Sequence, residues 1–322
     1  MSRNFIGVDV SQDYLDALVR PTAVRRRFAN DSEGIAELLA WVQPYGAERI
    51  VFESTGPYQK AAVGALLAAG LPVVVVNARQ VRDFAKAMNH LAKTDKIDAA
   101  VIAHFGEVAT TTVRPLESQE TCDLRELYDR RGQLVRMLVM EKNQRHAATV
   151  GQASAKVLKN IDEHLDYLKG QIRDLEQRMD RIIESSATFQ ARNEILQTIT
   201  GIGPQVSRTL LAHLPELGRF SRQTIAALVG LAPFNDDSGM RSGPRHIRGG
   251  RAKVRIGLYQ AAIAAIRHCP NMKAFYANLK ARGKASRVAI IAVARKLLVL
   301  ANALIRDMAP YRERQTPFAK NA

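Results

Sequence analysis

The first third of the chain alternates between short apolar runs and amphipathic stretches. Five β-strands are predicted: three of them, at residues 5–10, 49–53 and 72–76, are mainly apolar, and two more, at residues 14–20 and 24–29, are joined by a Pro21-Thr22 turn. The amphipathic and Ala-rich stretches between and after them predict helices at residues 31–43, 58–69, 78–88 and 99–108. This order of elements predicts a mixed α/β sheet whose first three strands form a meander, with helices on both faces.

The middle of the chain, residues 117–190, has a different pattern and contains almost no glycine or proline. Apolar residues recur there at alternating intervals of four and three residues, at Ile161, Leu165, Leu168, Ile172, Leu175, Met179 and Ile182. Such spacing is typical of the a/d seam of a coiled coil or of a long helical hairpin. We expect a helical coiled-coil stalk that mediates self-association. The alternative is that the seam is one face of an intramolecular bundle.

A Gly-x-Gly turn opens the last part of the chain, at Gly201 and Gly203, and a predicted helix follows it. A turn of this kind between helices resembles a helix-hairpin-helix, which holds a DNA phosphate through backbone N–H groups. A plain helix–helix turn is the alternative. A Gly- and Arg-rich stretch then breaks the helical pattern, and helices are predicted at residues 252–268 and 285–308. Together these patterns predict three domains, at residues 1–115, 116–192 and 193–322.

Charge is concentrated at one end of this 322-residue chain, whose net charge is +16. Residues 240–322 carry 18 Lys and Arg against 2 Asp and Glu, whereas the rest of the chain is nearly balanced. Such a segment attracts polyanions, nucleic acid above all. The candidate nucleic-acid contacts in it are Arg241, Arg245, Arg248, Arg251 and Lys253, beside Gly201 and Gly203. No apolar run approaches the roughly 20 residues of a membrane span, and two cysteines stand in no metal-binding spacing, so we expect a cytoplasmic protein without a membrane partner.

Four acidic residues stand at the ends of predicted elements. Asp9 lies in an otherwise apolar strand, Glu53 ends the fourth strand, and Asp95 and Asp98 open a late helix on one helical face. Capping and helix-dipole complementation explain the last two when they are considered alone. A hard divalent cation prefers carboxylate oxygens and would relieve the repulsion among all four. Acids from a first strand, a fourth strand and a late helix resemble those of ribonuclease H-like nucleases and integrases.

Ser238 is the candidate nucleophile, because it lies beside glycine in the Gly- and Arg-rich loop. The alternative interpretation is a loop that only contacts phosphate. Ser242 is four residues further along the same loop and is a second candidate. Serine–histidine hydrolase motifs are absent from the sequence.

Several motifs together resemble the insertion-sequence 110 (DEDD) family of transposases. They are Gly7-Val8-Asp9, Phe52-Glu53-Ser54-Thr55-Gly56, Lys93-Thr94-Asp95-Lys96-Ile97-Asp98-Ala99, Thr200-Gly201-Ile202-Gly203, Gly230-Leu231-Ala232-Pro233 and Ser238-Gly239. They occur in the family's order over nearly the whole chain. The resemblance implies a ribonuclease H-like first domain and a mainly helical C-terminal transposase domain.

The resemblance also implies an activity. It implies a recombinase that moves its own DNA element, with Mg²⁺, or Mn²⁺ in its place, held by Asp9, Glu53, Asp95 and Asp98. It implies that Ser238 forms a transient link to DNA and that a structured non-coding bridge RNA selects donor and target DNA. It further implies dimers that assemble into tetramers with shared sites, in the nucleoid of a prokaryote.

Two other interpretations fit parts of the sequence. One is a Mg²⁺-dependent, structure-specific DNA nuclease of the Holliday-junction-resolvase kind, with the same four acids but with water as the nucleophile. A covalent protein–DNA adduct separates it from the serine recombinase. The other is a non-enzymatic scaffold that binds nucleic acid. Clustered acids weigh against the scaffold, because without a metal they would repel one another and DNA.

Overall fold

The computed structural model describes residues 3–54, 56–89, 95–109, 118–234, 237–238, 241–242 and 246–312, of which residues 95–98, 237–238 and 241–242 are described by their backbone. The chain divides into two compact units, Met1–Glu117 and Ser118–Ala322. Each unit has its own hydrophobic core. The division into a separate stalk and C-terminal domain remains a prediction.

A five-stranded mixed sheet in the order β3-β2-β1-β4-β5 forms the centre of the first unit. The strands are β1 (Phe5–Val10), β2 (Tyr14–Arg20), β3 (Val24–Ala29), β4 (Arg49–Glu53) and β5 (Val73–Val76). The first three strands pair antiparallel, whereas β4 lies parallel to β1 and β5 parallel to β4. The predicted meander and mixed sheet are therefore confirmed.

Helices cover both faces of this sheet. They are α1 (Ser32–Val42), the 3₁₀ turn η1 (Gln43–Tyr45), α2 (Lys60–Ala68), α3 (Ala78–Ala87) and α4 (Asp95–Val108). Ile6, Val8 and Val10 of β1 are buried in one core with residues of α1 and α2. Val51 of β4 is buried in another core with residues of α3 and α4. Since side chains alternate along a strand, the residues between Ile6, Val8 and Val10 face α4.

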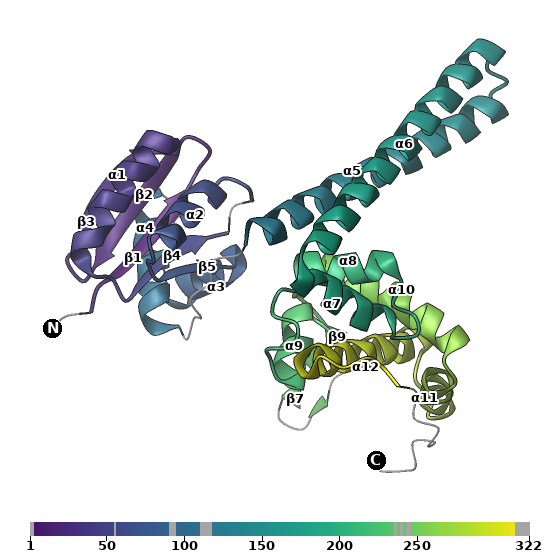
Figure 1. The fold of residues 1–322 in the computed structure, drawn as a ribbon. Helices are drawn as coiled ribbons and strands as arrows, with labels where there is room; N and C mark the ends of the chain where they lie inside the picture. Colours follow the sequence, from purple (N-terminus) through teal and green to yellow (C-terminus); the bar gives the residue numbers. More distant parts are fainter. Residues whose placement is uncertain are drawn as a thin grey trace. The chain divides into compact units, whose positions relative to one another are not determined.

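The second unit begins with a hairpin of two long helices, α5 (Gln119–Val150) and α6 (Ala155–Ser185) (Figure 1). Ser118 and Ser154 cap their first turns, each accepting a backbone N–H three residues on. The α6 seam packs inside the chain, partly against Leu134 of α5. Its buried members are Leu165, Leu168, Ile172, Leu175, Met179 and Ile183. The seam is therefore one face of an intramolecular bundle, as in the alternative interpretation. At its end Ile183 is buried, where Ile182 was predicted.

Six more helices build the main core of the second unit. They are α7 (Ala187–Gln197), α8 (Pro204–His213), α9 (Arg222–Val229), α10 (Ala252–His268), α11 (Pro270–Ala281) and α12 (Ser286–Asp307). Helices α9 and α11 were not predicted. Helix α12 is long and apolar enough to cross a membrane by length and composition. Its inward face, from Ala289 to Ile305, packs in this core, and its buried Asn302 binds Gly218 N–H and Phe220 C=O.

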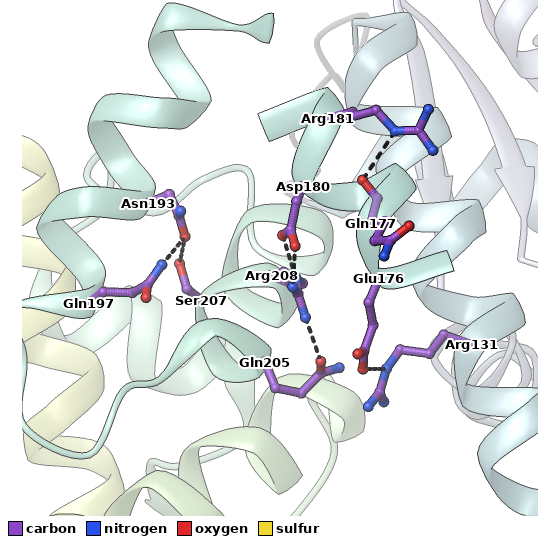
Figure 2. A network of polar contacts seen from close by, with 10 residues as sticks. All are labelled: Arg131, Glu176, Gln177, Asp180, Arg181, Asn193, Gln197, Gln205, Ser207 and Arg208. Carbon is purple, nitrogen blue, oxygen red and sulfur yellow. Dashed lines mark hydrogen bonds and ion pairs between the residues drawn. The ribbon is translucent and has the colours of Figure 1, made fainter. Parts of the chain in front are cut away.

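A polar network joins the α5–α6 hairpin to α7 and α8 (Figure 2). The Arg208 guanidinium of α8 donates two hydrogen bonds, of 2.9 and 2.6 Å, to the Asp180 carboxylate of α6. Arg131 of α5 donates to Glu176 of α6 over 2.6 Å. The Ser207 hydroxyl donates to Asn193 of α7 over 2.6 Å. Paired charges in this half-buried position fix the base of the hairpin on the helical core.

Candidate active site

Asp9 and Glu53 lie side by side at one edge of the sheet. Val8 of β1 pairs with Phe52 of β4 in a parallel register, so the following residues, Asp9 and Glu53, are also neighbours. Alternation along the strands turns both side chains toward α4, because Val8 and Phe52 are buried on the α1–α2 side. Both carboxylates are half-buried.

Gly7 allows α4 to cross the sheet in direct backbone contact with β1. A Cβ atom at this position would lie 2.3 Å from both Ala99 O and Ala103 N. Only glycine leaves room for an approach of this kind. The crossing point on α4 is therefore the turn from Ala99 to Ala103, one turn after the helix begins at Asp95.

The opposite end of α4 is anchored at the other edge of the sheet. Arg49 donates hydrogen bonds to Gly106 O (2.8 Å) and Ala109 O (3.3 Å), and Arg20 pairs with Glu107 at 2.9 Å. Arg20 and Arg49 are both register partners of Phe5, the first residue of β1. A cation at the carbonyl end of a helix is favourable. The helix therefore runs antiparallel to β1 and starts at the edge where Asp9 lies.

These contacts bring the start of α4 level with Asp9. From Gly7, Asp9 is two strand residues away, about 7 Å at the rise of a β-strand. From the crossing point on α4, Asp98 and Asp95 are about 5 and 9 Å back at the rise of an α-helix. The first turn of α4, which carries Asp95 and Asp98, therefore starts at the end of the sheet where Asp9 and Glu53 lie. The side chains of Asp95 and Asp98 lie outside the described residues, as does the predicted cap Thr94.

The donor set at this edge suits a hard divalent cation. Asp9 and Glu53 supply two adjacent carboxylates on one face, and oxygen ligands are those that Mg²⁺ and Mn²⁺ prefer. Two such carboxylates repel each other, and a cation between them would relieve that repulsion.

The loop that carries Ser238 is pinned at both ends in the second unit. A Cβ atom at Gly230 would lie 2.3 Å from Gly249 O, and one at Gly250 would lie 2.3 Å from Gly230 N. Both glycines have positive φ, +77° and +68°. Arg251 N–H also donates to Leu228 O over 3.2 Å. The loop therefore leaves and re-enters the helical core at almost the same point.

The described parts of this loop form two short antiparallel strand pairs. Near its ends, β6 (Pro233–Phe234) pairs with β9 (His246–Ile247). Further out, β7 (Asp237–Ser238) pairs with β8 (Arg241–Ser242), with Ser238 opposite Arg241 and Asp237 opposite Ser242. The backbones of the two candidate serines thus belong to different strands and are not register partners.

The predicted phosphate contacts of the Gly-x-Gly turn have different surroundings. Gly201 has φ +101°, and a Cβ atom there would lie 2.5 Å from Ala261 O of α10. Close packing on α10 is therefore sufficient reason for a glycine at this position. Gly203 is exposed, with nothing within 4 Å of the place that a Cβ atom would take, and it precedes the first turn of α8. Its neighbourhood is where free helix N–H groups face outward.

The predicted basic contacts also divide into two kinds. Arg248 is exposed and stacks its guanidinium 5.0 Å above the Phe234 ring. Arg251 instead binds both oxygens of Glu216 and the His213 carbonyl, and Lys253 pairs with Asp129. These two cations hold α10 to neighbouring elements. Arg245 lies outside the described residues, as do the side chains of Arg241, Ser238 and Ser242.

His213 belongs to the same cluster, which the sequence did not point to. Its Nε2 atom lies 3.1 Å from Asp129 Oδ1, and its ring stands edge-on to Tyr128. Burial lowers the pKa of His213 to about 4, although Asp129 opposes that shift. The imidazole is therefore neutral at neutral pH, and the ion pairs of the cluster are those of Arg251 with Glu216 and of Lys253 with Asp129.

The residues that place the acids were not among those predicted from the sequence. Gly7 and Arg49 carry no chemistry of their own, yet they set where α4 begins relative to Asp9. For Gly7 a signal was present, because a glycine inside an apolar strand often marks a close backbone approach. For Arg49 no local signal exists, since its partners, Gly106 and Ala109, are 57 and 60 residues away.

Two parts of the chain match transposase family models, and several known proteins are similar to it. Residues 6–151 match a transposase family model of the DEDD, IS110 type, and residues 193–277 match the transposase IS116/IS110/IS902 family. The pilin gene-inverting proteins of Moraxella bovis and Moraxella lacunata are each 26% identical over 98% of this chain and 99% of their own length. The insertion element IS900 uncharacterized 42 kDa protein of Mycobacterium paratuberculosis is 30% identical over 55% of this chain and 44% of that protein.

A sheet edge with adjacent carboxylates, together with these matches, defines the class of the protein: it is a DNA transposase or recombinase. The first matched region contains the four predicted acids, and the second contains the Gly-x-Gly turn. The chain belongs to the IS110 family of transposases. Membership in this DEDD family implies that its activity depends on a divalent metal.

Proposed function

We propose that this transposase cuts and rejoins DNA by a serine mechanism at a carboxylate site formed by Asp9, Glu53, Asp95 and Asp98. The observation that carries the proposal is the convergence of β1, β4 and the start of α4 at one sheet edge. The strand order β3-β2-β1-β4-β5 supports a ribonuclease H-like domain around that site. Mg²⁺ held by these carboxylates would neutralise the charge of a scissile phosphodiester.

In this proposal Ser238 is the nucleophile. Its hydroxyl oxygen attacks the phosphorus, a P–O bond to DNA forms on the serine, and the displaced DNA oxygen leaves with a proton. Attack by a DNA hydroxyl on the phosphoserine reverses these steps and rejoins the strands. Bond energy is conserved, so no nucleotide cofactor is required. The pinned ends of the loop at Gly230 and Gly250 support a loop that is held in place at its base.

The reaction tests this role directly. We expect Ser238→Ala to abolish cleavage and to leave DNA binding unchanged, because one hydroxyl contributes little to an interface of many phosphates. Wild-type protein stopped during the reaction should give an SDS-resistant protein–DNA band whose modified peptide contains Ser238. Ser242→Ala is the matched control and should remain active. Cleavage by Ser238→Ala without any adduct would instead support the water-using nuclease.

The partners follow from the same proposal. A structured bridge RNA would select the donor and target DNA, and the basic C-terminal segment, 18 Lys and Arg against 2 acids after residue 239, supports binding of nucleic acid. Protein purified at low salt should retain RNA and prefer the RNA of its own element over an unrelated hairpin of equal length. Equal affinity for both RNAs would remove guidance from the proposal and leave DNA recombination in place.

We also propose that the active form is a dimer that assembles into a tetramer, located with the DNA in the cytoplasm. The α5–α6 hairpin would act as a coiled-coil stalk in this assembly. Its α6 seam is covered by α5, so association would use outward residues, and Met137, Val139 and Met140 of α5 are exposed large apolar residues. Mixing Ser238→Ala with Asp9→Asn protein should restore activity if sites are shared between subunits. The names of the Moraxella relatives suggest DNA inversion as an outcome worth assaying beside transposition.

A further inference from the structure

The turn between α11 and α12 concentrates positive charge on an exposed surface. Within eight residues the chain places Lys280, Arg282, Lys284 and Arg287. All four side chains are exposed, as are the residues between them. The turn follows the region matched by the family model, which ends at residue 277.

No acid neutralises this basic turn within the described residues. From residue 270 to residue 312, Asp307 is the one acidic residue, and it pairs with its neighbour Arg306. None of the four cationic side chains has a hydrogen bond or an ion pair with another described residue. Arginines elsewhere in the same unit differ, since Arg131 and Arg208 are both paired with carboxylates. Unpaired clustered cations raise the local potential for a polyanion.

The backbone of the turn is fixed. Gly283 has φ +75°, and the N–H of Lys284 reaches back to Leu279 O over 3.1 Å, as in a Schellman cap. Behind the turn, Lys296 Nζ lies 4.3 Å above the Phe275 ring, which ties α12 to α11. A fixed turn presents its cations with little additional ordering of the backbone on binding.

The chemistry of the turn favours a duplex backbone over single-stranded nucleic acid. Residues 280–287 contain no aromatic side chain on which an unpaired base could stack, and Phe275 and Tyr276 before them are half-buried. Recognition of single strands depends on such stacking, whereas contacts to a duplex backbone need cations and N–H groups. We propose that the α11–α12 turn binds the phosphate backbone of the duplex DNA on which the enzyme acts.

This inference rests on DNA as the substrate and is independent of the serine mechanism and of RNA guidance. The test compares two full-length variants that each lose three positive charges. One carries Lys280→Gln, Arg282→Gln and Lys284→Gln in the turn. The matched control carries Lys142→Gln, Lys156→Gln and Lys159→Gln, all exposed on the α5–α6 hairpin. Affinity for a fluorescent DNA duplex and for an RNA duplex of the same sequence is measured as salt is varied.

We expect the turn variant to bind DNA about 10- to 100-fold more weakly at about 0.15 M salt, with the slope of log affinity against log salt reduced by roughly two to three units. The control should keep the wild-type affinity and slope. Because the substituted residues are exposed, both variants should melt at the wild-type temperature. Wild-type DNA affinity in the turn variant, an equal loss in the control, or a loss confined to the RNA duplex would overturn the proposal. Each readout is binding alone, so failure of the serine or RNA proposal leaves it interpretable.

Discussion

Gly7→Ala is the sharpest test of how the fold places the candidate site. The added methyl group would lie 2.3 Å from Ala99 O and Ala103 N and 2.9 Å from Ala103 Cα. All three neighbours are backbone atoms of α4, so no side-chain rotation relieves the contact. To reach an ordinary separation of 3.4 Å, α4 must move away from β1 by about 1 Å.

The magnitude of the effect follows from this displacement. Overpacking of a core by one methyl group costs about 1–3 kcal/mol, and here the obstacle is backbone, so we expect about 2–3 kcal/mol of lost stability. A misplacement of about 1 Å in a catalytic arrangement lowers the rate by roughly 100-fold. Because α4 starts beside Asp9, strand exchange should fall by about that factor even in the folded variant.

Gly64→Ala is the matched control in the same unit. Gly64 is exposed within α2, and nothing lies within 4 Å of a Cβ atom at this position. Replacing it should stabilise the helix by about 0.5–1 kcal/mol and leave activity unchanged. Urea unfolding followed by far-UV circular dichroism and a strand-exchange assay would report on both variants. A Gly7→Ala protein with wild-type stability and activity would refute the placement of α4 described above.

Three further predictions concern other parts of the chain. Asp9→Asn and Glu53→Gln should abolish strand exchange while leaving thermal melting intact, and full wild-type activity in EDTA would contradict a metal site. Asp180→Asn should lower the stability of the second unit by about 2 kcal/mol, because the Arg208 guanidinium, whose side chain is 11% exposed, loses its charged partner. A thermal melt within error of wild type would contradict this. Burial lowers the pKa of His213 to about 4, so below pH ~6.5 the unfolded chain binds a proton that the folded unit does not. The free energy of unfolding should therefore fall by about 1–2 kcal/mol as the pH drops from ~6.5 toward 4. In the His213→Gln variant, chemical unfolding at several pH values should show a smaller change over this range.

Local patterns were enough to predict much of the fold. The five strands were predicted correctly, and Asp9 and Glu53 lie in β1 and at the end of β4 as expected. The mainly apolar runs of β1, β4 and β5 mark buried strands, and an acid in such a run stands out. Helix α11 was missed, since it starts at Pro270 directly after α10 and has one buried residue, Met272, to mark its face. The α6 seam was identified, but the sequence alone does not say which helix covers it.

Ion-pair partners that lie far apart along the chain could not be predicted from the sequence. Arg251 and Lys253 were predicted to contact nucleic acid because they belong to a basic segment. Their carboxylate partners, Glu216 and Asp129, are 35 and 124 residues away, and no pattern near either cation announces them. The same limit applies to charge counting in general, because an excess of cations in a segment does not show which of them remain unpaired after folding. In this chain the unpaired cations include the four of the α11–α12 turn, which no sequence motif indicated.

The family motifs of this chain contain two kinds of residue, and the structure separates them. Asp9 and Glu53 carry carboxylates. The glycines instead leave space for a neighbouring backbone: Gly7 for α4, Gly201 for α10, and Gly230 for Gly249 at the base of the loop that carries Ser238. A carboxylate can be changed to its amide with little effect on packing, so its loss should appear in activity alone. A motif glycine cannot gain a methyl group without moving an element, so its loss should appear in stability and activity together. The positions that are most informative about how the site is assembled are therefore glycines, which could take no part in the chemistry.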